Sequence, residues 1–372
     1  MKLSVAIYGI KSMQRSRARA GDFWWCFLIA FVVFIATQSV TMANELEEKL
    51  AKAVEAGELA GLHSVLVIHR GEVLAEKYFA GGDERRGRYL GRVQHRPQSL
   101  HDLRSVTKSV TGLLYGIALA EGLVPELNES VVAQFPEYPD LAGDEARQAI
   151  LVRHALTMTM GTEWNEDLPY TDPRNSEIAM EMARDRYRFV LDRPMEREPG
   201  EKWDYNGGAT AIIARLIAKG TGKPIDVFAK EKIYSPLGID EFEWVKGRDG
   251  EPSAASGLRL RIGDLAKIGT MILDGGRWQG RQVVPEEWLS ASFTPQTSAV
   301  SGLRYGLFWW LGPEGSPPTW VAGFGNGGQR LSVSQVSQLV VVVFAGNYNQ
   351  PDAWKVPYKV IVDHVLPAIQ GR

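Results

Sequence analysis

Three short groups of residues in this chain have the types and spacing that nucleophilic catalysis requires. The first is Ser105-Val-Thr-Lys108, an S-x-x-K tetrad at the front of an apolar segment. Apolar residues recur in that segment at three- and four-residue intervals, which predicts a helix with Ser105 in its first turn and Lys108 on the same face. A lysine can take a serine's proton if burial or neighbouring positive charge lowers its pKa.

The tetrad also has a purely structural interpretation. A four-residue pattern of two common residue types occurs by chance about once in a chain of this length. Serine near a helix start is also a good N-terminal cap. Two further groups downstream favour the catalytic interpretation.

The second group surrounds Tyr205, in a turn over residues 199–210 that leads into a helix predicted over 211–219. A cationic lysine beside a tyrosine lowers the pKa of its hydroxyl, and a tyrosinate is a competent general base. The alternative is an ordinary half-buried tyrosine with a solvated hydroxyl.

The third group is Gly323-Phe-Gly-Asn-Gly-Gly-Gln-Arg330, which leads into a predicted strand. Glycines let a backbone approach a ligand closely, and a strand edge can present N–H groups to an oxyanion. A plain hairpin turn is the alternative, because Asn-Gly is a strong hairpin signal.

The elements that must position these groups are strands at both ends of the chain and helices between them. A hairpin is expected from 64–68 and 73–79, whereas the polar segment 83–99 is expected to be a surface loop. The patterns predict one antiparallel sheet, from about 44–104 and 250–372, with a helical region inserted at about 105–249. Further strands are expected over 305–311, 329–333 and 339–345, and helices over 45–56 and 355–366.

Residues 1–43 have the features of a signal peptide. A basic segment precedes an apolar run over 23–36, and Thr41-Met-Ala43 offers a small-residue cleavage site before Asn44. The pattern predicts a secreted or bacterial periplasmic protein, with an uncleaved anchor in the inner membrane as the alternative. The remaining residues 44–372 are long enough to form a sizeable core.

The cysteine count and the net charge exclude or disfavour several classes of function. The only cysteine, Cys26, lies in the apolar run, so the mature chain can form no disulfide, cysteine-based zinc cluster or cysteine nucleophile. Without residues 1–43 the chain has 37 basic and 43 acidic residues, a net charge of −6. This balance argues against nucleic acid as a partner, and it limits expected membrane contact to an uncleaved N-terminal segment.

The order of the three groups resembles that of the serine hydrolases related to class C β-lactamases and D-alanyl-D-alanine carboxypeptidases. These carry S-x-x-K, then Y-x-N, then a K/H-T-G-like triplet on a strand. The resemblance covers about residues 50–368 and implies a β-lactamase/transpeptidase-like α/β (α+β) fold, in which an antiparallel sheet is flanked by helices. Other stretches similar to the family are Arg153–Gly161, Ser256–Leu260, Asp264–Lys267, Gly275–Gly280 and Tyr305–Trp310.

The resemblance also implies a role for each matching residue. Ser105 is the nucleophile that forms the acyl-enzyme, Lys108 is its proton partner, and Tyr205 is the tyrosine of the second motif. The backbone N–H groups of Ser105 and Gln329 form the oxyanion hole. The reaction needs neither a metal nor an organic cofactor.

Two departures from the family pattern bear on the substrate. Gly207 stands where the family has asparagine, unless Asn206 substitutes from one position earlier. Asn326-Gly327-Gly328 replaces the K/H-T-G triplet and lacks the cation and hydroxyl that hold a substrate carboxylate. Arg330, on the same strand face as Gly328, could compensate. Expected substrate-binding residues are Asn206, Asn326, Gly327, Gly328, Arg330 and, as an apolar wall, Trp164.

These features predict hydrolysis of ester or amide bonds in small substrates, because the motifs look most like those of esterase and 6-aminohexanoate-dimer-hydrolase relatives. A β-lactamase or D-alanyl-D-alanine carboxypeptidase is one alternative. A catalytically silent binding protein on the same scaffold is another, since two of the three motifs are degenerate. His154 lies in no Ser-His-acid motif and is expected to pack at a helix start.

Overall fold

The computed structural model describes residues 44–370. The predicted signal peptide over residues 1–43 therefore lies outside the described residues. Among the described helices, none has the length and apolar character needed to cross a bilayer.

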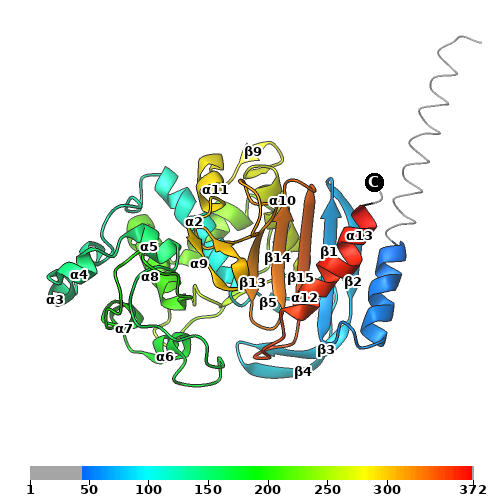
Figure 1. Ribbon diagram of the computed structural model, residues 1–372, viewed down its shortest axis with the longest axis horizontal. Helices are drawn as coiled ribbons and strands as arrows, with labels where there is room; N and C mark the ends of the chain where they lie inside the picture. Colours follow the sequence, from blue (N-terminus) through cyan, green and yellow to red (C-terminus); the bar gives the residue numbers. More distant parts are fainter. Residues whose placement is uncertain (1–43, 371–372) are drawn as a thin grey trace, which may run out of the picture.

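The centre of the molecule is an eight-stranded antiparallel sheet in the order β10-β11-β12-β13-β14-β15-β1-β2 (Figure 1). β15 pairs with β1, so the two ends of the chain form one sheet. The run Leu-Val-Val-Val-Val-Phe-Ala of β15 is buried on both faces, as a central strand requires. The strands are β1 (Leu62–His69), β2 (Glu72–Tyr78), β10 (Thr297–Ser298), β11 (Arg304–Tyr305), β12 (Trp310–Leu311), β13 (Val321–Gly325), β14 (Gln329–Ser334) and β15 (Leu339–Ala345).

Smaller sheets lie beside the central one. β3 (Ala80–Arg85) and β4 (Arg88–Gln94) form a hairpin, so the surface loop expected over 83–99 is wrong. These strands are mostly polar and partly exposed, and they lack the alternating apolar residues by which a strand is recognised. The other pairings join β5 (His101–Asp102), β7 (Leu258–Leu260) and β6 (Glu243–Trp244), and β8 (Arg277–Trp278) with β9 (Arg281–Gln282).

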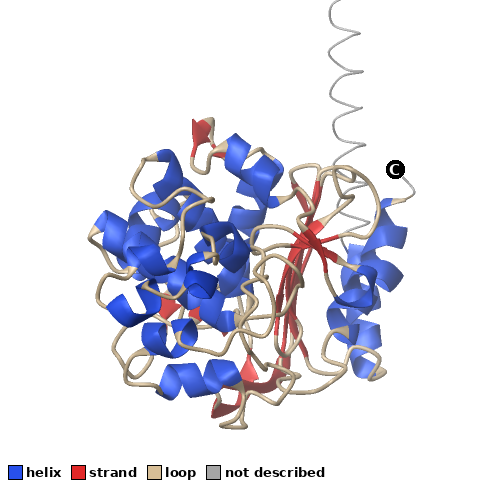
Figure 2. Cartoon of the chain, turned by 60° about the vertical axis from the view of Figure 1, so that its left-hand side comes forward, coloured by secondary structure: helices blue, strands red, loops and turns tan. Residues whose placement is uncertain are grey.

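Helices cover both faces of the sheet (Figure 2). α10 packs on β14 and β15 on one face, while residues 44–55, which are helical, and the C-terminal helices pack on the other. The expected antiparallel sheet flanked by helices is therefore confirmed. The helices are α2 (Val106–Ala120), α3 (Pro139–Ala142), α4 (Glu145–Gln148), α5 (Val152–Leu156), α6 (Ser176–Met182), α7 (Arg186–Leu191), α8 (Gly207–Thr221), α9 (Ile225–Ala229), α10 (Ile262–Leu273), α11 (Glu286–Ser292) and a C-terminal run of α12 (Lys355–Lys359), η4 (Val360–Val365) and α13 (Leu366–Ile369), with short turns η1 (Val132–Gln134), η2 (Lys230–Tyr234) and η3 (Val300–Gly302).

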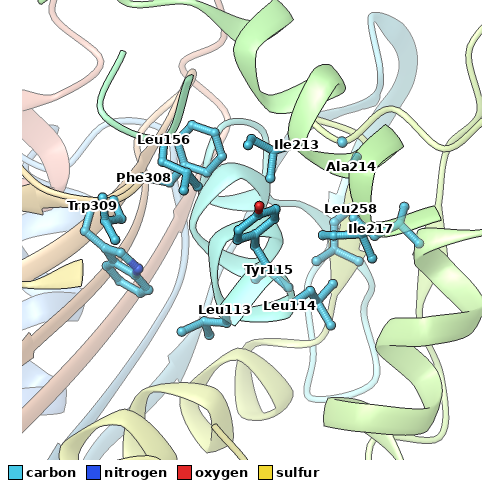
Figure 3. Packing of buried hydrophobic residues seen from close by; sticks show 14 of the residues in the cluster. Leu113, Leu114, Tyr115, Leu156, Ile213, Ala214, Ile217, Leu258, Phe308 and Trp309 are labelled. Atoms are coloured by element: carbon cyan, nitrogen blue, oxygen red, sulfur yellow. The ribbon is translucent and has the colours of Figure 1, made fainter. Parts of the chain in front are cut away.

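α2 lies between the sheet and the helical region, and every residue from Val106 to Ala118 is buried. A helix with apolar residues on every face is covered by other elements on all sides. Side chains of α8, including Ile213 and Ile217, cover one side of α2, and Phe308 and Trp309 lie on another (Figure 3). The core therefore fixes α2, and with it the residues at its N-terminus.

Two glycines of β13 let the sheet approach the start of α2. A Cβ atom on Gly323 would lie 3.0 Å from Oγ of Ser109, and one on Gly325 would lie 2.4 Å from the carbonyl oxygen of Leu103. Residues 323 and 325 share one face of the strand because side chains alternate. The end of β13 is thus packed directly against the residues that lead into Ser105.

Gly325→Ala should destabilise the fold by about 1–3 kcal/mol, because its methyl group would collide with backbone that cannot move independently. Gly263→Ala is the matched control: it lies in the first turn of α10, and its Cβ would have nothing within 4 Å. Urea unfolding of both variants measures the difference. Equal stability of the two variants would contradict the close approach of β13.

Candidate active site

Ser105 and Lys108 meet at the N-terminus of α2 as their spacing predicts. Ser105 directly precedes the helix, and Nζ of Lys108 lies 3.1 Å from its Oγ. The Lys108 side chain is buried, with 1% of its surface exposed. A nucleophile candidate and a buried cation are therefore in direct contact.

The other contacts of Lys108 come from two distant segments. Nζ donates to the carbonyl oxygen of Ala255 at 3.1 Å and lies 3.3 Å from Oε2 of Glu177. Together with Ser105 these give the ammonium group three acceptors for its three N–H bonds. Glu177 lies in the first turn of α6, where Asn175 caps the helix by accepting from the Glu177 N–H at 3.0 Å.

The Lys108–Glu177 pair sets the charge of the lysine. Burial lowers the pKa of Lys108, but Glu177, with Tyr205 and Glu166, raises it further, so that the pKa lies above its usual value. The lowered pKa that would allow Lys108 to take the serine's proton is therefore not found in the resting site. In the resting site Lys108 is an ammonium cation that donates to Ser105 rather than a free amine that could accept its proton.

Glu177 is held as a carboxylate. Burial raises its pKa, but Lys108 and Arg86 lower it below the usual range. Arg86 places Nη1 3.6 Å from Oε1 of Glu177, and the Ser256 hydroxyl donates to the same oxygen. Both oxygens of this buried carboxylate are thus occupied, which fixes its orientation.

Tyr205 lies in the turn before α8, with its ring centroid 4.9 Å from Nζ of Lys108. The ring also stacks on Trp310 at 5.9 Å. Burial raises the pKa of Tyr205, whereas Lys108 and a hydrogen bond with Ser105 lower it, and the net direction is upward. The resting residue is therefore a neutral phenol beside a cation and the serine.

A second acidic residue, Glu166, lies in the loop between α5 and α6. It accepts from the Trp164 indole at 2.6 Å, from the Tyr170 hydroxyl at 2.7 Å and from the Gly207 N–H at 2.5 Å. Burial raises the pKa of Glu166 to about 7, against the opposing effect of Lys108. Glu166 therefore changes its charge near neutral pH.

Gly207 explains why the two acids fit. A Cβ atom on Gly207 would lie 2.6 Å from Oε2 of Glu177 and 3.0 Å from Oε1 of Glu166. The glycine that replaces the family's asparagine thus vacates the space that the acids occupy. Sequence reasoning missed Glu166 and Glu177, and the departure at Gly207 was the only signal of them.

Two residues expected to bind substrate have structural contacts instead. Asn206 is the N-cap of α8, because its Oδ1 accepts from the Ala209 N–H at 2.9 Å and the side chain is buried. Trp164 is 6% exposed and packs against Gly208, where a Cβ atom would lie 2.6 Å from the indole. Its N–H orients Glu166, so Trp164 acts as a support rather than as an open pocket wall.

The expected triplet Asn326-Gly327-Gly328 forms the turn between β13 and β14. The Asn326 side chain exchanges hydrogen bonds with Asn349, at 2.8 Å and 3.2 Å. Gly327 and Gly328 have φ values of 96° and 98°, which glycine adopts most readily. A Cβ on Gly327 would lie 2.6 Å from the Tyr348 ring, so the turn is packed beneath the segment that follows β15.

The structure does not bring Arg330 to Ser105. In β14, Leu331 packs near α10, whereas Arg330 shares the opposite face with Ser332, toward the C-terminal helices. Its guanidinium carbon lies 3.6 Å from the Phe324 ring centroid. Arg330 is thus held against Phe324, and its part in substrate binding stays a prediction.

Gln329 and His154, for which the sequence also predicted roles, are held by hydrogen bonds. Gln329 begins β14 opposite Gly325, and its side chain bridges the Asn326 carbonyl at 2.8 Å and the Ala345 N–H at 3.1 Å. Its part in an oxyanion hole stays a prediction. The structural role of His154 is confirmed, because its Nδ1 accepts from the Leu151 N–H at the start of α5.

Within residues 44–370, one group of histidine and acidic side chains is spaced closely enough to hold a metal ion. It does not include Ser105 or Lys108, and it ends at His101, four residues before Ser105.

Glu177→Gln should cost about 3–5 kcal/mol of stability at pH 7, because the buried Lys108 ammonium loses its charged partner. In the wild type the pKa of Lys108 is higher in the folded protein than in the unfolded chain. The resulting stabilisation is complete below the unfolded pKa of about 10.4, and it is lost as pH rises through the pKa of Lys108 in the folded protein. In the variant, burial lowers that pKa, so stability grows as pH rises. The difference measured by urea unfolding should therefore be smaller at pH 9.5 than at pH 7.

Glu163→Gln is the control for this comparison, because Glu163 pairs with Arg193 on the surface with 46% of its side chain exposed. An exposed pair contributes up to about 1 kcal/mol. A loss in Glu177→Gln that stays equal at both pH values would contradict a charged Lys108 in the folded protein.

Comparisons with known proteins agree with this fold. The chain is 26% identical over 310 residues to the 6-aminohexanoate-dimer hydrolase of Paenarthrobacter ureafaciens, covering 77% of this chain and 73% of that protein. It is 24% identical over 208 residues to the lovastatin esterase of Penicillium rubens, covering 49% of each. Among solved structures, the octameric penicillin-binding protein homologue from Pyrococcus abyssi matches with a TM-score of 0.64 at 19% identity, covering 88% of this chain and 77% of that one.

A further solved structure, EstCE1, a hydrolase with promiscuous acyltransferase activity, matches with a TM-score of 0.66 at 13% identity, covering 88% of this chain and 99% of that one. These structural likenesses show the fold. The family model described as Beta-lactamase matches residues 46–360. Because this match spans the sheet, α2 and the helical region, the chain belongs to the beta-lactamase family, whose relatives named above are hydrolases.

Proposed function

We propose that this protein is a serine hydrolase that cleaves ester or amide bonds of small substrates through an acyl-enzyme on Ser105. The observation that carries the proposal is the contact between Ser105 Oγ and Lys108 Nζ at 3.1 Å, with Tyr205 beside both. A nucleophile, a cation and a proton acceptor in contact form the combination that covalent catalysis by serine requires.

The charges of the site suggest which group accepts the proton. Glu177 keeps Lys108 protonated, so the base function falls to Tyr205. The resting phenol is neutral, and it becomes a base when the Lys108–Tyr205 pair loses one proton to solvent and leaves a tyrosinate beside the Lys108 cation. Because Lys108 and Tyr205 interact closely, they lose their protons in two coupled steps, and neither step is assigned to one residue alone.

The proposed reaction has two stages. In the form of the Lys108–Tyr205 pair that has lost one proton, the Ser105 proton moves to the Tyr205 phenolate oxygen as Oγ bonds to the substrate carbonyl carbon, and an oxyanion forms. When the bond to the leaving group breaks, the proton passes from Tyr205 to the departing oxygen or nitrogen. Water then attacks the acyl-enzyme by the same proton transfers and releases the acid.

The Ser105 N–H, at the N-terminus of α2, is one proposed donor to the oxyanion. Gln329 is the second donor that the family resemblance predicts. The end of β13 is a further candidate, because Gly325 packs against Leu103 and Arg104, immediately before the nucleophile.

Ser105→Ala should abolish labelling by a fluorophosphonate, because no other hydroxyl group among residues 44–370 is hydrogen-bonded to the Lys108 ammonium. Ser109→Ala is the matched control: Ser109 lies one turn later on α2 and donates to the Phe308 carbonyl at 2.8 Å. Intact-mass spectrometry should detect one adduct on the control and on the wild type. A wild type that is never labelled would favour the silent binding protein, and an adduct on Ser105→Ala would assign the nucleophile elsewhere.

The charges around Lys108 indicate the kind of substrate. Glu177 brings negative charge to the site, as does Glu166 above its pKa of about 7, and Arg330 lies on the other face of the sheet. A β-lactam or a peptide C-terminus brings a carboxylate, and the loss of a charge-assisted hydrogen bond to it costs about 1.5–3 kcal/mol, roughly ten- to a hundredfold in binding. We therefore favour uncharged esters and amides over the substrates of β-lactamases or carboxypeptidases.

Short p-nitrophenyl esters should be hydrolysed at least about tenfold better than nitrocefin by kcat/KM, because their acyl groups carry no carboxylate. Steady-state kinetics with both substrates measures the ratio. Arg330→Gln should leave the ratio unchanged, since Arg330 faces the C-terminal helices. If nitrocefin is the better substrate and Arg330→Gln removes that preference, the side chain reaches the substrate after all.

A further inference from the structure

Four buried side chains from four separate segments converge below the strand that leads to Ser105. They are His63 of β1, Asp83 of β3, His95 just after β4 and His101 of β5. Their exposed fractions are 0%, 2%, 3% and 1%. One possible ligand atom from each lies within 4.8 Å of all the others. Half of the six histidines of the chain are therefore gathered in one buried place.

The contacts within this histidine cluster place an acceptor nitrogen of His101 against a ring nitrogen of His63 and a carboxylate oxygen of Asp83. Nδ1 of His101 lies 3.0 Å from the Asp102 carbonyl oxygen, which requires its proton there and leaves Nε2 unprotonated. That Nε2 lies 2.9 Å from Nδ1 of His63 and 3.6 Å from Oδ1 of Asp83. Oδ1 of Asp83 already accepts from the Tyr348 hydroxyl at 2.9 Å.

His95 has a ring nitrogen that lacks a hydrogen-bond partner in the described part of the chain. Its Nε2 is buried and has no hydrogen-bond partner among residues 44–370. Its ring stacks on His63 with centroids 4.1 Å apart. A buried polar atom without a partner costs about 1–3 kcal/mol, so such an atom calls for a ligand, an ion or a water.

The three imidazoles are buried away from water, which disfavours a charged ring. Neutral imidazole is the form of histidine that binds metals.

We propose that His63, Asp83, His95 and His101 bind one divalent transition-metal ion of the zinc type. Three imidazole nitrogens and a carboxylate oxygen are ligands that zinc accepts in four-coordinate sites. Calcium and magnesium require oxygen ligands, so the three nitrogens disfavour them. The bond from His101 to the Asp102 carbonyl is the outer contact by which metal-ligating histidines are oriented.

The geometry requires only small shifts of the ligand atoms, and the nitrogens of His63 and His101, 2.9 Å apart, must separate by about 0.5 Å. Ligands about 2.0–2.1 Å from a tetrahedral zinc ion lie about 3.4 Å from one another. The widest pair in the cluster must therefore approach by about 1.4 Å relative to the 4.8 Å limit. The His63 ring has little freedom to leave, since a Cβ atom on Gly81 or on Gly346 would lie within 2.5 Å of it.

The ion would have a structural role. The β3–β4 hairpin lies outside the central sheet, and the cluster links it to β1 and to β5. His101 also stacks on Phe344 of β15, with centroids 4.6 Å apart. All four ligands are buried, so no coordination position opens to a substrate, as in structural rather than catalytic zinc sites.

Metal analysis of the purified protein without a polyhistidine tag tests this proposal. After removal of metal by a chelator, titration with Zn²⁺ should restore one ion per chain, measured by elemental mass spectrometry. The Tm should rise as the ion binds. Co²⁺ should give the intense visible absorption of a tetrahedral complex, and Mg²⁺ should leave Tm unchanged. A protein that binds no stoichiometric Zn²⁺ or Co²⁺ would show that the cluster is a hydrogen-bonded network alone.

His95→Gln should weaken zinc binding at least about tenfold. His364→Gln, in the C-terminal helical run, is the matched control and should bind as the wild type does. Unchanged binding by His95→Gln would overturn the ligand assignment. If His95→Gln does not fold, the titration of the wild type still decides, and neither measurement depends on the activity of Ser105.

Discussion

The buried charge of Lys108 is the constraint that the rest of the site satisfies. An ammonium group away from water is stable only with a close counter-ion and acceptors for its N–H bonds. Glu177 and the Ala255 carbonyl supply these, and the missing side chain of Gly207 leaves room for the carboxylate. The same ion pair that makes the burial possible also fixes Lys108 as a cation, which transfers the expected base function to Tyr205.

The Lys108–Glu177 pair is the start of a longer chain of alternating charges. Arg86 contacts Glu177 and Glu181 at 3.6 Å each, and Glu181 in turn lies 3.3 Å from Arg186. Arg86 stands at the tip of the β3–β4 hairpin, whereas Glu177 and Arg186 belong to α6 and α7. The hairpin therefore joins the sheet side of the molecule to the helical region, and it orients the carboxylate that holds Lys108.

Sequence patterns revealed the parts of this structure that depend on neighbours along the chain. β14, β15 and α2 follow from hydrophobic periodicity, and Ser105 meets Lys108 because three residues make nearly one helical turn. Asn206 also had a readable signal, since asparagine before an apolar helical pattern is a typical N-cap. Arg86 had none, and Glu177 had only the indirect one of the glycine at position 207, because tertiary contacts between remote segments give both residues their role.

The backbone just before Ser105 shows how these constraints combine. Arg104 has a φ of 49°, a conformation that costs a non-glycine residue about 1–2 kcal/mol. Asp102 holds it there, because its carboxylate lies 3.2 Å from Nε of Arg104 and accepts from the Arg86 N–H at 2.7 Å. If these contacts were lost, Arg104 could relax to an ordinary conformation and turn the Ser105 hydroxyl away from Lys108. The geometry of the nucleophile is therefore maintained by β5 and its neighbours as much as by the helix that follows.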